Sequence, residues 1–375
     1  MKKRTIQVVL LVALIVTLLQ TPVAAAVDGT WTEMSPTVIP PTRCDTCFAY
    51  DSESDVAILF GGTTGPVTQI VFNDTWAYDY DSDTWTNKSP SVAPSARLAC
   101  QYAYDSESDK FIVFSGAIGG TTGTHFNDTW VYDYDTNTWT EISPSVMPDP
   151  RRYGCMAYDS ESDRIILFGG IHYEGGTIGD TWAYDYNTNT WEEMSPSVAP
   201  SSRFYPVMAY DSESDKIILF SGAFTSTDTW AYDYNTNTWE NMNPETEPDD
   251  GVAHMAYDSE KDLCVLFGGL NEDDEVNNVT WTYDYNSNTW SNASVSTCPC
   301  ARERGALVYD IESDVTLLYG GMGPGNWDEL LNDTWSLELS EPTNTPPPLD
   351  WGPLILVTVG VGVVIIVLVV FFRRR

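Results

Sequence analysis

Short apolar runs alternate with polar turns throughout residues 28–339, and their order repeats. One unit reads CMAY up to Tyr158, a polar turn, RIILF from Arg164, the alternating segment DTWAYDY from Asp180, and WEEM from Trp191. Alternation of apolar and polar positions, with aromatic and β-branched residues, is typical of β-strands. Each unit therefore predicts four short strands, and no long stretch between residues 28 and 339 carries a helical period.

A tyrosine-led phrase fixes the spacing of the units. Tyrosine followed by DSESD, DSEKD or DIESD occurs six times, at intervals of 54, 54, 52, 47 and 52 residues. The six tyrosines are Tyr50, Tyr104, Tyr158, Tyr210, Tyr257 and Tyr309. The second apolar run of each unit ends in GG or SG, where the chain needs a positive φ or a close backbone approach. A period near 50 indicates a repeat architecture, and four strands per repeat arranged radially form a β-propeller.

The pattern resembles that of the kelch family through three features that recur in order across nearly all of residues 28–339. These are the glycine pair, a third-strand tyrosine (Tyr78, Tyr132, Tyr184, Tyr232, Tyr283) and a fourth-strand tryptophan (Trp85, Trp139, Trp191, Trp239, Trp290). Ser115 and Ser221 replace the first glycine, and Leu337 replaces the sixth tyrosine. The resemblance implies an all-β, six-bladed kelch-type propeller that serves as a scaffold and seldom as an enzyme.

The sixth repeat stops after its third strand, at SLELS, and its missing strand stands at the other end of the array. Residues 30–36, TWTEMSP, match the fourth-strand segment TWTEISP of residues 138–144. We expect this N-terminal strand to complete the last blade and to close the ring without an exposed edge. The alternative is an open array of six repeats with exposed sheet edges.

The two ends of the chain predict export and anchoring. Residues 1–26 read as a signal peptide, with a basic start, an apolar core and a small-residue cleavage site. The propeller is expected over 27–339 and a proline-rich linker over 340–352. Residues 353–372 are long enough for one transmembrane helix across roughly 30 Å of hydrocarbon, and the basic tail 373–375 is expected in the cytoplasm. The predicted location is the cell membrane, single-pass, with the propeller outside; a wall-sorting signal is the alternative.

The charge balance excludes one class of partner. The chain has 54 acidic and 18 basic residues, and six of the basic ones lie in the two ends, so the exposed part carries a formal charge of −42. A surface of this sign repels nucleic acid. We therefore expect no nucleic-acid partner, membrane contact through the C-terminal helix, and an extracellular protein or glycan as ligand.

Seven cysteines in a chain predicted to be exported indicate disulfides and a leftover thiol. Cys44 and Cys47 enter the first blade, and Cys298 and Cys300 enter the sixth, so we expect at least one disulfide between these pairs across the seam. The alternative for these four is a zinc site. Buried thiols are expected at Cys100, Cys155 and Cys264. Six sequons mark expected glycosylation, at Asn73, Asn87, Asn127, Asn278, Asn292 and Asn332.

The loops between second and third strands, and those between blades, differ from repeat to repeat, whereas the opposite turns are nearly constant. Variable loops on a constant scaffold usually carry binding. Seven residues before each repeat tyrosine stands an arginine, expected near the channel mouth: Arg43, Arg97, Arg151, Arg203 and Arg302, with Asp250 in the fifth repeat. These arginines read either as donors to an acidic ligand or as structural groups that bond loop carbonyls or a neighbouring aspartate. Candidate aromatic contacts on the same face are Tyr153, Tyr205 and Trp327.

Metal binding has one candidate place. A cluster of acidic residues in the fifth repeat offers the hard oxygen ligands that calcium prefers; its members are Asp249, Asp250, Asp273, Asp274 and Glu275. The repeated turns such as DYDTNTW match only the first half of a calcium loop, because the glycine and the final glutamate are absent. No cofactor is expected, with calcium as the possible exception.

The sequence favours a non-enzymatic role. His125, His172 and His254 come from different repeats, and none sits in a nucleophile or metal-ligand motif. The predicted function is binding of a protein or glycan through the variable loops, for adhesion or envelope organisation. The alternative is a carbohydrate-active enzyme that acts on sugars such as sialic acid at the channel mouth, a role that an acid and a base buried together in that mouth would favour.

Overall fold

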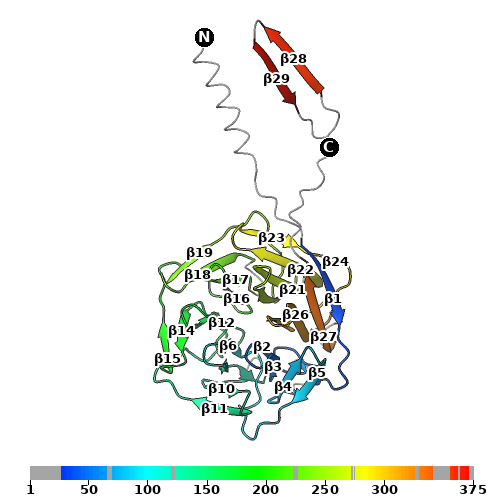
Figure 1. Cartoon of the computed structure of the whole chain (residues 1–375). Helices are drawn as coiled ribbons and strands as arrows, with labels where there is room; N and C mark the ends of the chain where they lie inside the picture. The colour runs from blue at the N-terminus through cyan, green and yellow to red at the C-terminus, as the bar shows by residue number, and fades with distance from the viewer. Residues whose placement is uncertain are drawn as a thin grey trace.

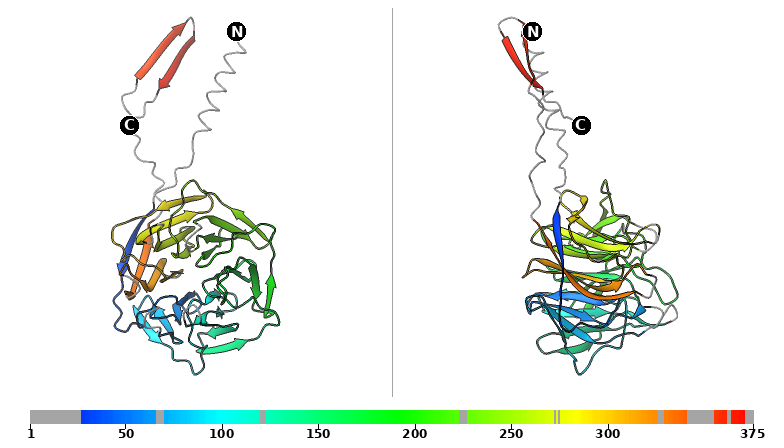
Figure 2. Two further views of the ribbon diagram at one scale, coloured as in Figure 1. Left: turned by 180° about the vertical axis from the view of Figure 1, so that it is seen from behind. Right: turned by 90° about the vertical axis from the view of Figure 1, so that its right-hand side faces the viewer.

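The computed structural model describes residues 27–65, 70–119, 123–222, 227–271, 273, 275–325 and 329–340, together with the backbone of 355–361 and 364–370. Six sheets of mostly antiparallel strands stand around a central channel, and the repeats follow one another around it (Figure 1). Viewed from the side, the ring is a shallow disc (Figure 2). The prediction of an all-β, six-bladed propeller is confirmed.

Each blade runs from the channel outward, and the repeats supply the expected strands. Blade 1 contains β2 (Cys47–Asp51), β3 (Val56–Phe60), β4 (Thr75–Asp79) and β5 (Thr84–Asn87). Blade 2 contains β6 (Gln101–Asp105), β7 (Lys110–Phe114), β10 (Thr129–Asp133) and β11 (Thr138–Ile142), and its loop adds β8 (Ala117–Ile118) and β9 (Thr124–His125). Blade 3 contains β12 (Cys155–Asp159), β13 (Arg164–Phe168), β14 (Thr181–Asp185) and β15 (Thr190–Glu193).

Blades 4 to 6 follow the same plan, and the second and third strands are longer in blades 5 and 6. Blade 4 contains β16 (Val207–Asp211), β17 (Lys216–Phe220), β18 (Thr229–Asp233) and β19 (Thr238–Asn241). Blade 5 contains β20 (His254–Asp258), β21 (Leu263–Leu270), β22 (Val276–Asp284) and β23 (Thr289–Asn292). Blade 6 contains β25 (Ala306–Asp310), β26 (Val315–Met322), β27 (Leu330–Leu339), β1 (Asp28–Glu33) and β24 (Ser294–Val295).

The ring closes through the N-terminal strand, as predicted. Strand β1 pairs antiparallel with β27, and Trp31 stands opposite Leu337 (Figure 1). The short strand β24, from the segment that leads into blade 6, adds to the outer edge of β1 in parallel. The sequence did not predict this extra strand, which covers part of an edge that β1 would otherwise expose.

Neighbouring blades are joined by one repeated contact. In five of the six blades the indole Nε1 of the fourth-strand tryptophan donates to the third-strand threonine of the preceding blade, as Trp139 does to Thr75 at 2.9 Å. Trp191 and Thr129 occupy the same positions in blades 3 and 2 without this bond. Trp31 makes the same bond to Thr280 at 3.0 Å, so the closing strand docks on blade 5 like any other fourth strand. The buried apolar clusters lie between adjacent blades. The paired tryptophans and threonines of the repeat are therefore inter-blade contacts.

The repeated YDSESD phrase forms the turns of one face, here called the constant-turn face. Tyr104 donates to Asp51 of the preceding blade at 2.8 Å and to Asp109 of its own turn at 2.9 Å. Asp51 also accepts from the backbone N–H of Ser54 and so caps its own turn. These contacts explain the phrase by turn and inter-blade hydrogen bonds, without a metal. The opposite face, formed by the loops that differ, is called the variable-loop face.

The first glycine of the GG pair is needed because two blades meet there. Gly61 has a φ of +69°, and a Cβ at this position would lie 2.7 Å from the carbonyl oxygen of Arg97 in the next blade. Ser115 adopts a φ of 57° at the equivalent place in blade 2, and its hydroxyl donates to the carbonyl of Arg151 at 2.8 Å. The serine thus replaces the close approach with a hydrogen bond.

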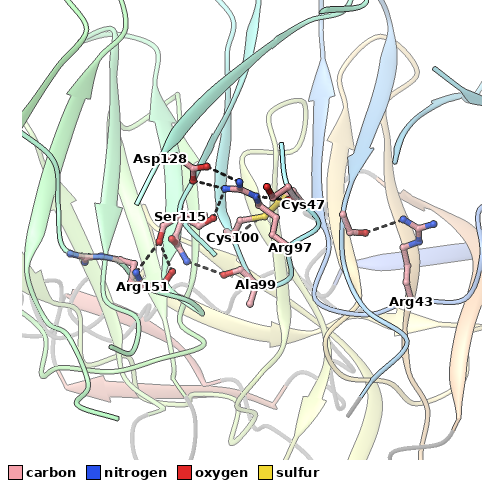
Figure 3. The surroundings of a disulfide bond; sticks show 11 residues. Arg43, Cys47, Arg97, Ala99, Cys100, Ser115, Asp128 and Arg151 are labelled. Atoms are coloured by element: carbon pink, nitrogen blue, oxygen red, sulfur yellow. Dashed lines mark hydrogen bonds and ion pairs between the residues drawn. A yellow bond between two sulfur atoms is a disulfide. The ribbon is translucent and has the colours of Figure 1, made fainter. Parts of the chain in front are cut away.

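The predicted disulfide between the two cysteine pairs is wrong. Cys47 is bonded to Cys100 instead, with their Cα atoms 6.6 Å apart, and the bond joins blades 1 and 2 (Figure 3). Cys47 opens β2 and Cys100 immediately precedes β6, so both lie on the inner strands of neighbouring blades. Cys298 and Cys300 are free and lie on the segment that leads into blade 6, where Asn278 and Arg302 donate to their sulfur atoms. Cys44, Cys155 and Cys264 are buried thiols.

The helix expected over 353–372 is not found in the described part of that range. Ile355–Val361 and Val364–Val370 form two strands, β28 and β29, which pair antiparallel with each other. Valine and isoleucine dominate this segment, and their branched Cβ atoms favour extended backbone. Among the residues the structure describes, no helix has both the length and the apolar character needed to cross a bilayer. The signal peptide 1–26 and the linker from residue 341 lie outside the described residues.

The two ends of the propeller leave together from the constant-turn face. The amide of Ser340 donates to the carbonyl of Asp28 at 2.9 Å, just beyond the paired ends of β27 and β1. A third strand runs toward the turn that joins it to the fourth, and these turns belong to the constant-turn face. Ser340 and Asp28 therefore both lie on the face opposite the variable loops.

Candidate functional site

The central channel has a volume of about 440 Å³ and is lined by the first strand of every blade. Small side chains such as Ala49, Ala103 and Ala157 line its middle, and the six repeat tyrosines surround it near the constant-turn face. At the variable-loop face it opens into a mouth of about 100 Å³. Because the loops that differ between blades converge on this mouth, it is the candidate site.

The five predicted arginines do not line the channel or its mouth. Each is buried inside its own blade and forms a bidentate ion pair with the aspartate that precedes the third strand. The pairs are Arg43–Asp74, Arg97–Asp128, Arg151–Asp180, Arg203–Asp228 and Arg302–Asp333.

Arg97 shows the whole pattern (Figure 3). Its Nε donates to the carbonyl of Ser95 at 3.1 Å, and its two Nη atoms donate to Ser115 and to Asp128 at 2.7 and 2.8 Å. The Phe126 ring covers the guanidinium at 4.3 Å. The geometry favours the structural interpretation of these arginines; a contact between them and a ligand stays a prediction.

The fifth repeat replaces the arginine with a buried acid. Asp250 is 3% exposed and accepts from the Asn277 side-chain amide at 2.5 Å. Burial, reinforced by the charge of Asp249, raises the pKa of Asp250 to about 6. Within the described residues no group of three or more His, Cys, Asp or Glu side chains is placed to hold a metal. Asp274 of the predicted calcium cluster lies outside the described residues.

The mouth is built from the residue two positions after each repeated arginine and, in the fifth repeat, two positions after Asp250. All six residues at this position adopt the left-handed backbone conformation, with φ between 53° and 58°. They are Asp45, Ala99, Tyr153, Tyr205, Val252 and Arg304. Four backbone hydrogen bonds link these residues around the mouth, because each N–H donates to the carbonyl of the equivalent residue in the preceding blade. The first runs from Asp45 to Arg304 at 3.1 Å and the last from Tyr205 to Tyr153 at 2.8 Å. One backbone geometry thus presents six positions, and five different residue types occupy them.

Four of these side chains and one neighbour form a row across the mouth. The Arg304 guanidinium lies over the Tyr205 ring at 5.0 Å, and Tyr205 stacks on Tyr153 at 4.0 Å with an interplanar angle of 26°. The Arg152 guanidinium lies 5.1 Å from the Tyr153 ring. Asp45 accepts from the Tyr205 hydroxyl at 3.3 Å and pairs with Arg304 at 3.8 Å. We call this set the Arg–Tyr–Tyr–Arg row.

Burial shifts the pKa values of the titratable groups at the mouth. Burial raises the pKa of the Asp45 carboxyl, although the charge of Arg304 and the Tyr205 hydrogen bond oppose the shift. Burial also raises the pKa of Tyr153 to about 12. His254 lines the mouth from β20, and its Nε2 accepts the backbone N–H of Gly305 at 2.8 Å. Because burial and the charge of Arg302 lower its pKa to about 3, His254 is neutral at physiological pH.

The chemistry of the mouth suits recognition. Guanidinium groups bind oxyanions, and aromatic rings with hydroxyl groups contact sugars or the side chains of a protein partner. The predicted contacts Tyr153 and Tyr205 lie here; Trp327 lies outside the described residues. Sequence reasoning missed Asp45, Arg152 and Arg304. The signal was the pair of residues after each repeated arginine, which reads CD, LA, RY, FY, GV and ER, whereas the arginine itself repeats.

The predicted glycosylation sites differ in their surroundings. Asn73, Asn87, Asn127 and Asn292 are exposed. Asn278 is half-buried, and its side-chain amide donates to the Cys298 sulfur at 3.0 Å and to the carbonyl of Pro299. Asn332 is also half-buried. The exposed four are therefore the better acceptors.

Comparison with known proteins establishes the family. The family model for the KLHDC2/KLHL20/DRC7 Kelch-repeats domain matches residues 21–201 and 161–348. The chain therefore belongs to the kelch-repeat family, as the glycines, tyrosines and tryptophans predict.

Its similarity to individual proteins is more limited. The chain is 26% identical to the dynein alpha chain of the flagellar outer arm of Chlamydomonas reinhardtii over 317 residues, which covers 77% of this chain and 7% of that protein. It is 27% identical to Adagio protein 3 of Arabidopsis thaliana over 195 residues, covering 49% of this chain and 29% of that protein. The chain thus spans less than a third of the length of these relatives.

Among solved structures, that of YjhT matches with a TM-score of 0.62 and 15% identity. The match covers 80% of this chain and 95% of that chain. At this level of identity the likeness supports the propeller fold alone.

Proposed function

We propose that this chain is a non-enzymatic binding protein of the cell surface, whose ligand is a protein or glycan held at the variable-loop face. The observation that carries the proposal is the mouth itself. Six equivalent backbone positions carry different side chains there, next to arginines that repeat and are fully used by the scaffold. A conserved frame with divergent contact residues is the arrangement expected of a binding surface.

Display outside the cell rests on the apolar ends of the chain. If residues 353–372 enter a bilayer, the lipid supplies an environment in which a helix satisfies every backbone group. The linker begins at the constant-turn face, so anchoring would turn the variable-loop face away from the membrane. The proposed mouth would then be directed toward ligands in the surroundings.

The test is a binding and turnover screen with the full-length chain against glycan and protein arrays. Saturable binding that falls when Tyr153→Ala or Arg304→Gln is introduced, without any change in the ligand, supports the proposal. Arg164→Gln is the matched control, because Arg164 pairs with Asp185 in blade 3, away from the mouth. Binding that is insensitive to both mouth variants contradicts it.

A sugar-active enzyme is the second candidate, and one observation favours it. Asp45 is 9% exposed, carries a raised pKa and contacts the Tyr205 hydroxyl at the mouth, as a general acid held near its substrate would. In this case Asp45→Asn would abolish turnover of a sugar and leave its binding intact. Turnover of any screened sugar would overturn the non-enzymatic proposal.

A further inference from the structure

Arg152 differs from the other cations of the described part of the chain. The five buried arginines, Arg164, Arg304 and three of the four lysines each make an ion pair with a carboxylate. Lys88 lies over the Tyr134 ring at 3.6 Å. No described carboxylate lies within ion-pair distance of Arg152, and its Nε atom is buried without a hydrogen-bond acceptor. In a chain with a net charge of −36, a half-buried arginine without an acid stands out.

Two histidines share the neighbourhood of Arg152. His125 comes from β9 of blade 2, where it pairs with Ala117. His172 comes from a blade 3 loop that is closed by backbone hydrogen bonds between Arg152 and Ile171 and between His172 and Gly176. The exposed Tyr173 ring meets the His125 ring edge-on, with centroids 5.9 Å apart. These contacts bring the described parts of the two loops together between blades 2 and 3, where the charges of Arg152 and His172 act on His125.

This cluster has unmet hydrogen-bonding capacity, and no described carboxylate forms an ion pair with it. The charge of Arg152 acts on Asp45, but Asp45 is paired with Arg304. The Nδ1 atom of His125 is buried without a partner, like the Nε atom of Arg152. Burial, then the charges of Arg152 and His172, lower the pKa of His125. Glu174 is exposed at the tip of the same loop, and no ion pair joins it to the three basic groups within the described residues. Buried polar atoms normally have partners, and an anionic acceptor would satisfy the Arg152 Nε–H and a protonated His125 Nδ1 together.

We infer that Arg152, His125 and His172 form an oxyanion site that receives a carboxylate, sulfate or phosphate group of the ligand. An oxyanion would accept from the guanidinium and from the imidazole nitrogens, and its charge would offset their mutual repulsion. The site adjoins the mouth, because Arg152 is itself the last member of the Arg–Tyr–Tyr–Arg row and lies 5.1 Å from the Tyr153 ring. The inference deepens the proposed function, since it states which chemical group the mouth's ligand carries.

The chain offers a direct readout because it contains three histidines. The full chain, produced without a histidine tag and labelled with ¹³C at the imidazole Cε1, is titrated with sodium formate and, separately, with sodium sulfate near pH about 6.5. Sodium chloride of equal ionic strength is the baseline. The signals of His125 and His172 should shift saturably, and that of the buried His254 should not. A response to formate alone indicates a planar carboxylate as the natural group, and a response to sulfate alone indicates a tetrahedral one.

Matched variants separate the site from general electrostatics. Arg152→Gln and Arg164→Gln remove the same charge, so they change the net charge of the chain equally. Arg152→Gln should weaken the apparent anion affinity at least about tenfold, the effect of losing a charge-assisted hydrogen bond, and Arg164→Gln should leave it unchanged. His125→Gln is a second variant with the same expectation, and an unshifted His254 signal reports an intact fold. Equal effects of both arginine variants, or no saturable shift in the parent chain, would overturn the inference.

The outcome is separable from that of the proposed function. Saturable anion shifts together with an empty ligand screen would leave the site standing and remove the proposed function. Ligands that bind at the mouth and are unaffected by Arg152→Gln would support the function and refute the oxyanion site.

Discussion

At the scale of the residue, the repeated arginine and the two residues that follow it have different roles. The repeated arginine is consumed by the scaffold, with its donors directed at an aspartate and at loop carbonyls. The next two residues are free of that task and differ from blade to blade. Mutations at the first position should therefore change stability, and mutations at the others should change binding.

Arg203→Ala should destabilise the fold by about 3 kcal/mol, because it leaves a desolvated carboxylate and a carbonyl without their donor. In the parent chain burial alone would raise the pKa of Asp228, but Arg203 and Trp230 more than offset this and lower it. Urea denaturation measures the change. Arg164→Ala, at a partly exposed pair, should cost less than about 1 kcal/mol, and an equal loss for the two variants would argue against the scaffold role.

Asp250 should make the stability of the fold fall with rising pH, whereas an ordinary salt-bridged acid makes it rise. Its folded pKa is about 6, above the reference value of 3.8, so the folded state binds the proton more tightly than the unfolded state. The contribution of Asp250 to the free energy of unfolding is full below pH about 4 and is lost as the pH rises to about 6. Asp250→Asn should remove this loss, which is at most about 3 kcal/mol. Thermal unfolding between these pH values gives the answer, and parallel curves for parent and variant would refute it.

At the scale of the element, strand β1 closes the ring. Trp31 is 2% exposed, packs on Phe267 at 4.9 Å and bonds Thr280, so it belongs to the core between blades 5 and 6. Trp31→Ala should cost about 3–5 kcal/mol, as for other large core truncations. Chemical denaturation tests this. Glu33→Ala, on the exposed edge of the same strand, is the control, and a small effect of both changes would mean that the ring does not depend on β1.

The disulfide gives a second prediction at this scale. Cys47 and Cys100 are 53 residues apart in sequence, and a cross-link of that length stabilises by about 4 kcal/mol in the chain-entropy model. Peptide mapping without reduction should recover Cys47 linked to Cys100, and Cys47→Ser with Cys100→Ser should lower the melting temperature. Recovery of a bond between Cys47 and Cys298 or Cys300 would contradict the assignment.

The sequence predicted the elements well and the site less well, for physical reasons. Repeats reveal what every blade shares, and so the strands, the glycines and the closing TWTEMSP strand followed from comparison of units. The contacts of Arg43 and its equivalents depend on which way a loop turns its side chains, and the repeat pattern leaves both interpretations open. Asp45, Arg152 and Arg304 do not repeat, so they carried no pattern, and the disulfide required knowing which inner strands are neighbours in space.

At the scale of the whole molecule, the exit of the chain sets its orientation. The constant-turn face carries one exposed glutamate in each blade, at Glu53, Glu107, Glu161, Glu213, Glu260 and Glu312. If residues 353–372 anchor the chain, this acidic face lies on the membrane side, and the like charge of anionic lipids repels it.

Energy transfer to a membrane-bound acceptor dye checks this orientation. A donor dye attached through Glu161→Cys, in a background of Cys300→Ser, should transfer more strongly than one attached through Glu174→Cys. Glu161 lies on the constant-turn face and Glu174 in a variable loop, so the first should be nearer the bilayer. Equal transfer from the two positions, or the reverse order, would contradict the proposed anchoring.

The placement of the buried ion pairs has a consequence for how such a chain arises. Each of the five arginines and its aspartate belong to the same repeat, whereas the tryptophan–threonine bond, formed in five of the six blades, joins a blade to the preceding one. A duplicated copy of the unit would therefore bring its own internal brace and a connector that fits any neighbour. Such a gene can gain copies of the repeat without a new interface between blades. Sequence differences between repeats can then collect at the two residues after the arginine, which take part in neither the ion pair nor the tryptophan–threonine bond.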